Sequence, residues 1–68
     1  MKPLDEIGNT AGTVWRFLSD HGPATLYALE KEVGAPKALV AMAIGWLARE
    51  GKLSVETEGH IVRYTLAR

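Results

Sequence analysis

The spacing of apolar residues changes once along the chain, at Lys52, from a helical repeat to a two-residue alternation. Before Lys52, apolar residues recur every three or four positions, which is typical of amphipathic helices. After it, Leu53 and Val55 alternate with Ser54 and Glu56, which predicts a strand. We therefore expect helices first and a β-hairpin last, a mostly helical fold of the α+β class.

The first helix is predicted over about residues 6–21. Its apolar stripe consists of Ile7, Ala11, Val14 and Leu18. Asp5 or Asn9 is available as the N-cap, and Gly22-Pro23 closes the helix because proline cannot continue it.

Two shorter helices are predicted, over residues 26–33 and about 36–50. Thr25 is a suitable N-cap for the first of them, and Gly34 offers the left-handed position that often follows a helix. Pro36 suits the first position of the other helix. Its expected core face is Leu39, Val40, Ala43, Ile44 and Leu47.

Gly51 is expected to end the last helix and to lead into strands over about residues 52–57 and 60–66. Glu58-Gly59 is predicted to be the two-residue turn between them. This register pairs Thr57 with His60, Val55 with Val62, and Leu53 with Tyr64. The apolar face of the hairpin then consists of Leu53, Val55, Val62, Tyr64 and Leu66.

Three helices, with a tight turn between the second and third, followed by a two-stranded antiparallel hairpin make a winged helix-turn-helix. The hairpin is the wing, and the third helix is the recognition helix. At 68 residues the chain has room for one small domain, which we expect to span residues 1–68. It has no cysteine, so we expect neither disulfides nor thiolate metal sites.

Two segments resemble the signatures of a known family. The runs Thr10-Ala11-Gly12-Thr13-Val14-Trp15 and Ala43-Ile44-Gly45-Trp46-Leu47-Ala48-Arg49-Glu50 are similar to those of small bacterial winged helix-turn-helix proteins catalogued as a domain of unknown function. The similarity extends from about Ile7 to Leu66. It implies a winged-helix fold and an association with DNA, and it implies no catalytic residue, cofactor or ligand.

The charge balance argues against tight binding to nucleic acid. The chain has eight Lys and Arg residues in total and eight Asp and Glu residues, so its formal net charge is zero. DNA-binding domains usually have a basic excess. The basic residues are also scattered: Lys2, Arg16, Lys31, Lys37, Arg49, Lys52, Arg63 and Arg68.

If the chain contacts double-stranded DNA, the third helix is expected to enter the major groove and the wing to meet phosphates. The candidate groove residues are Lys37, Ala38, Ala41 and Met42, and the candidate phosphate contacts are Lys52, His60 and Arg63. Of the groove residues, only Lys37 has a polar head. The wing also carries Glu56 and Glu58, which oppose phosphate binding. DNA contact is therefore predicted to be weak or assisted, in a regulatory role.

A second apolar stripe on the third helix suggests an alternative to DNA contact, namely binding of a protein partner. Leu39, Met42 and Trp46 follow helical spacing beside the core stripe. Either Trp46 packs against the first helix or the wing, or Met42, Gly45 and Trp46 form a contact surface for a second copy or another protein.

Two glycines inside predicted helices, Gly12 and Gly45, need an explanation, because glycine destabilises a helix interior by about 1 kcal/mol relative to alanine. Close packing of the first and third helices, with Trp15 or Trp46 over a glycine, is the favoured one. Admission of a partner backbone or a phosphate by Gly45 is the alternative.

No catalytic or metal constellation is present in the sequence. Ser19, Asp20 and His21 are consecutive, so their side chains diverge and do not form a triad. Histidine pairs at metal-binding spacing are absent. Without a targeting sequence or a long apolar run, we expect a cytoplasmic, non-enzymatic module with no cofactor, no metal and no membrane contact.

Overall fold

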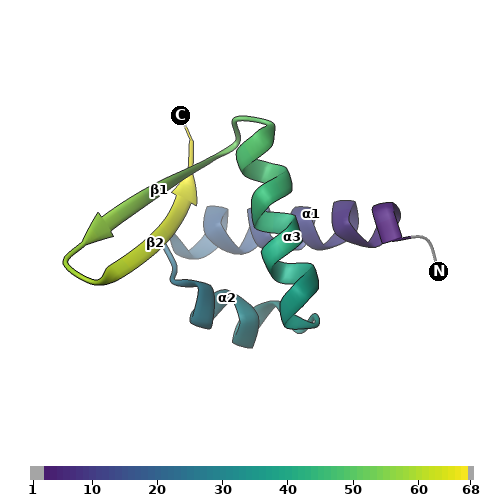
Figure 1. Ribbon diagram of the computed structural model, residues 1–68, viewed down its shortest axis with the longest axis horizontal. Helices are drawn as coiled ribbons and strands as arrows, with labels where there is room; N and C mark the ends of the chain where they lie inside the picture. The colour runs from purple at the N-terminus through teal and green to yellow at the C-terminus, as the bar shows by residue number, and fades with distance from the viewer. Residues whose placement is uncertain (1–2, 68) are drawn as a thin grey trace.

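The computed structural model describes residues 3–67 and confirms the predicted winged helix-turn-helix (Figure 1). In chain order the elements are α1 (Pro3–His21), α2 (Leu26–Val33), α3 (Lys37–Arg49), β1 (Leu53–Glu58) and β2 (Ile61–Leu66). Helix α3 crosses α1, and the hairpin projects away from the helices with its turn at the far end.

Helix α1 begins earlier than its apolar stripe predicts. It starts at Pro3, so Asp5 and Asn9 lie inside the helix and neither is the N-cap. Proline is favoured in the first turn because that position needs no backbone N–H. Asp5 and Glu6 in the first turn interact favourably with the positive end of the helix dipole. These two local effects account for the extra turn.

The predictions for α2 are confirmed, whereas Pro36 lies one position outside α3. The Thr25 side chain accepts a hydrogen bond of 3.2 Å from the backbone N–H of Ala28, and Gly34 has a φ of 74°. Pro36 has an extended ψ of 144°, so it is the residue before the helix, which begins at Lys37.

Gly51 ends α3 in the left-handed conformation, with a φ of 72°. The N–H of Gly51 donates to the carbonyl of Ala48, and the N–H of Lys52 donates to that of Leu47 at 2.9 Å. This pair of bonds is a Schellman motif, which satisfies the carbonyls of the last helical turn. It also turns the chain from α3 directly into β1.

One cluster of buried side chains joins the three helices and β1, and the half-buried Tyr64 and Leu66 of β2 pack against it. It consists of Ala11, Val14, Leu18, Ala24, Leu29, Val40, Ala43, Ile44, Leu47 and Leu53. Val14, Leu29 and Val40, one from each helix, are completely buried. Since the core uses the inner faces of α1 and α3, the opposite face of α3 is left to solvent.

The hairpin register differs by two residues from the predicted one. Glu58 pairs with Ile61, Val55 with Tyr64, and Leu53 with Leu66, so the turn residues are Gly59 and His60. Gly59 alone in this turn has a positive φ, as in the type II′ turn that places glycine first. The predicted turn would instead have placed Glu58 at that position, where a positive φ strains any residue with a Cβ.

The apolar face of the hairpin is buried only at its base. Leu53 is buried and Leu66 half-buried, but Val55 and Val62 are 55% and 40% exposed. A two-residue register shift keeps each side chain on its face, so the prediction is correct for the face and wrong for the burial of its outer half. The hairpin extends beyond the helices, which leaves nothing for that half to pack against.

Close packing does not explain the two helix glycines. A Cβ built on Gly12 or Gly45 meets no atom within 4 Å, so the favoured explanation, with a tryptophan over the glycine, is wrong. The inner faces of α1 and α3 meet through other residues, and these glycines face open space.

We therefore expect Gly12→Ala to raise the free energy of unfolding by about 1 kcal/mol, because alanine improves helix propensity without a clash. Gly51→Ala is the matched comparison, also with open space around it but with a positive φ. It should lower stability by about 1–2 kcal/mol. Urea denaturation followed by circular dichroism measures both; equal effects of the two substitutions would contradict this assignment.

Candidate nucleic-acid interface

The outermost row of α3 consists of Ala38, Met42, Gly45 and Arg49. These positions follow the spacing i, i+4, i+7 and i+11 and lie opposite the buried Val40, Ala43 and Leu47. All four row residues are exposed, with Met42 at 46%. The row therefore has no polar side chain at its first three positions and a cation at its C-terminal end. We call Ala38, Met42, Gly45 and Arg49 the outer row.

The remaining predicted groove residues lie beside this row. Lys37 is the first residue of α3, and Ala41 lies one turn further along the same side; both are exposed. Lys37 takes part in no ion pair within residues 3–67. The outer row thus has a cation near each end, and its middle contains no hydrogen-bonding side chain.

Arg49 was missed by the sequence analysis. It ends α3 and is exposed, and no ion pair of the described residues includes it. Its position four residues after Gly45 would have placed it on the outer row, had the helical spacing been followed to the end of the helix. A cation here also interacts favourably with the negative end of the helix dipole.

The predicted wing cations do not form a free basic patch. Lys52 Nζ lies 3.6 Å from Glu50 Oε1, and Arg63 Nη1 lies 3.5 Å from Glu58 Oε1. These pairs are exposed and contribute little to stability, but each keeps a carboxylate beside the cation. His60 is exposed in the hairpin turn. The hairpin therefore offers phosphates a surface of mixed charge.

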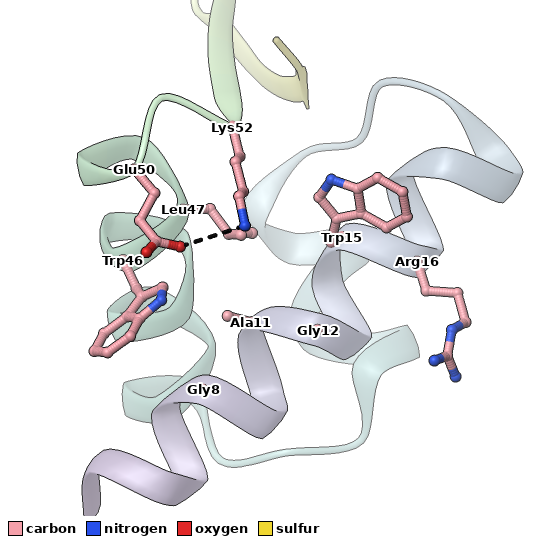
Figure 2. A pocket seen from close by; sticks show the side chains of 9 residues that line it. All are labelled: Gly8, Ala11, Gly12, Trp15, Arg16, Trp46, Leu47, Glu50 and Lys52. Carbon is pink, nitrogen blue, oxygen red and sulfur yellow. Dashed lines mark ion pairs between the residues drawn. The ribbon is translucent and has the colours of Figure 1, made fainter.

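The predicted protein-contact residues separate into two surfaces. Met42 and Gly45 belong to the outer row, whereas Trp46 lines a cleft of about 520 Å³ between α1 and α3. Figure 2 shows Trp46 at one side of this cleft and Trp15 at the other, with the α1 backbone at Gly8 and Gly12 between them.

Trp46 is 39% exposed in this cleft and Trp15 is 43% exposed. The two predicted arrangements of Trp46, packing against the first helix or the wing and contact with a partner, stay predictions. The Lys52–Glu50 ion pair lies at the rim of the cleft, and the Arg16 guanidinium points away from it. The cleft is a partly solvated aromatic surface next to the outer row.

His21 interacts with Phe17, one turn earlier in α1. Nδ1 of His21 lies 3.1 Å from the Phe17 carbonyl, to which it donates when protonated, and its ring stacks on Phe17 with a centroid distance of 4.3 Å. Within residues 3–67 no three His, Cys, Asp or Glu side chains are grouped so as to hold a metal ion. No helix in the same range has the length and apolar character to span a membrane.

Solved structures that are similar to this one include the following two. The solution NMR structure of protein BT2368 from Bacteroides thetaiotaomicron matches with a TM-score of 0.82 and 29% identity, over 91% of this chain and 76% of that chain. The crystal structure of the Zalpha domain from Carassius auratus PKZ in complex with Z-DNA matches with a TM-score of 0.75 and 22% identity, over 88% and 95% of the two chains. At 22% identity the second match supports the fold alone.

Sequence comparison identifies both a relative and a family. Uncharacterized protein MJ1608 from Methanocaldococcus jannaschii is 43% identical in an alignment of 53 residues, with a coverage of 74% for each of the two chains. The relatives thus include an archaeal protein, and the bacterial origin implied by the resemblance stays a prediction. The model of the winged helix-turn-helix domain named DUF2582 matches residues 1–65. The chain therefore belongs to the winged helix-turn-helix family DUF2582.

Proposed function

We propose that this protein is a non-enzymatic, regulatory winged-helix module of the cytoplasm that associates with double-stranded DNA through α3 and the hairpin. The observation that carries the proposal is the arrangement of its elements, with an exposed α3 beside a projecting hairpin. A similar fold was crystallised with Z-DNA in the Zalpha domain, which supports a nucleic-acid role for this architecture.

The charges of the interface favour weak binding through phosphates. Four cations are available around it: Lys37, Arg49, Lys52 and Arg63. Three carboxylates lie among them: Glu50, Glu56 and Glu58. Each carboxylate offsets part of the counterion-release free energy that dominates affinity for DNA. We therefore infer that Lys37 and Arg49, the two of these four cations that form no ion pair within residues 3–67, provide most of the phosphate contact.

A fluorescence titration with a mixed-sequence duplex at low and moderate salt tests the proposal. The logarithm of the binding constant should fall with the logarithm of salt concentration, with a slope of about −0.9 for each phosphate neutralised. Lys37→Gln and Arg49→Gln should each make the slope shallower by about 0.9. Arg16→Gln is the matched control, since Arg16 belongs to α1 and points away from the α1–α3 cleft; it should leave the slope unchanged. Absence of binding at low salt would refute the proposal.

The exposed aromatic and thioether groups favour a second candidate, self-association through α3. Met42 and Trp46 are 46% and 39% exposed on adjacent turns of the helix, and Trp15 continues this surface across the cleft. Tryptophan and methionine are enriched at protein interfaces, and burying their exposed apolar surface against a partner is favourable.

Sedimentation equilibrium over a concentration series tests the second candidate. The weight-average mass should rise with concentration for the unmodified protein and return to the monomer value in Met42→Glu, because a carboxylate would be buried in the interface. Leu4→Glu, at an exposed apolar position of α1, is the control and should not change the mass profile. A monomer at every concentration would exclude self-association.

A further inference from the structure

The middle of α3 can contact a base pair only through apolar groups. Ala38 and Met42 of the outer row, with Ala41 beside them, are exposed and have no hydrogen-bond donor among their side chains, and the thioether is only a weak acceptor. Arg and Lys are confined to the ends of the helix. This surface therefore cannot recognise guanine or adenine edges by bidentate hydrogen bonds.

The major groove offers one kind of apolar feature, the methyl group on C5 of a pyrimidine. Thymine has it, and cytosine has it when methylated at C5. An apolar side chain over such a methyl group removes apolar surface of both partners from water. The same side chain over an unmethylated cytosine or a guanine instead covers polar base atoms without replacing their hydrogen bonds, which is unfavourable.

Gly45 adds an independent observation. It is exposed in the middle of the outer row, and a Cβ at this position would meet nothing within 4 Å, so packing within the protein does not require a glycine here. Glycine in a helix interior is nonetheless destabilising. A missing side chain between Met42 and Arg49 lets the α3 backbone lie closer to the groove floor, which brings short alanine side chains within reach of methyl groups.

We propose that α3 discriminates between duplexes by the C5-methyl groups of pyrimidines, which Ala38, Ala41 and Met42 contact, while Lys37 and Arg49 hold the adjacent phosphates. This inference rests on the proposed association with DNA and names the chemical feature that the same surface recognises. The selectivity is for methyl density in the groove and not for one base sequence, as expected for a surface without directional hydrogen bonds.

Three duplexes of one length and base order test the inference in fluorescence anisotropy titrations at a single low salt concentration. The first contains thymine, the second has deoxyuridine at every thymine position, and the third has 5-methylcytosine for cytosine in the deoxyuridine background. Replacing thymine by deoxyuridine should weaken binding about three- to tenfold, the effect of losing one or two buried methyl contacts. Recovery with 5-methylcytosine would support recognition of methyl density; loss without recovery would contradict it, because the contact would then require thymine itself.

Met42→Gln provides the protein side of the test. It should lower the ratio of the dissociation constants for the first two duplexes, because the amide at position 42 no longer gains from a methyl group while Ala38 and Ala41 keep their contacts. Leu4→Gln on α1 makes the same kind of change at an exposed position outside α3 and should preserve the ratio. Circular dichroism verifies that both variants are folded.

The outcomes separate this inference from the proposed function. Equal affinity of the unmodified protein for all three duplexes would overturn methyl recognition and leave DNA association standing. Binding to none of them would overturn both. An unchanged ratio in Met42→Gln, with the ratio itself large, would show that Met42 does not read the methyl groups and would contradict the inference as stated.

Discussion

Two reciprocal backbone hydrogen bonds between Ala24 and Tyr64 determine where the hairpin lies relative to the helices. The N–H of Tyr64 donates to the carbonyl of Ala24 at 2.7 Å, and the N–H of Ala24 donates back at 3.0 Å. A two-stranded hairpin is only marginally stable in water by itself, so its position depends on such attachments. Ala24 lies two residues before the start of α2, and these bonds therefore tie the wing to the helix-turn-helix. Every interface that uses α3 together with the hairpin depends on this junction.

Most of the fold could be predicted from local chemistry. Thr25 and Gly34 bound α2 where their capping preferences place them, and Gly51 takes the left-handed φ that ends α3. The turn could not be placed with the same certainty, because Gly59 is a central residue in either register. In the structure the turn consists of Gly59 and His60, and Gly59 takes the first turn position, which has a positive φ. The faces of the strands were nevertheless predicted correctly, because both registers give each side chain the same side of the sheet.

The candidate site was predictable to a smaller extent. The apolar character of α3 follows from its sequence, but the ion pairs of Lys52 and Arg63 depend on side-chain positions that spacing does not determine. The surroundings of Gly12 and Gly45 depend on how closely two helices approach, which is a property of the packed molecule. Arg49 is a different case, because the helical repeat alone places it beside Met42 and Gly45. The tertiary structure was needed to find the ion pairs, whereas the helical repeat alone was enough to predict which residues share a face of α3.

The exposed outer half of the hairpin has a consequence for how copies of the protein behave in concentrated solution. Val55, Ile61 and Val62 are 55%, 45% and 40% exposed, and within residues 3–67 the outer edge of β1 pairs with no other strand. Such an edge is a template for adding strands from another molecule and so for aggregation. Glu56 and Glu58 lie on this edge strand, and two copies that paired edge to edge would bring their carboxylates together. The acidic residues of β1 thus disfavour the growth of a sheet between molecules.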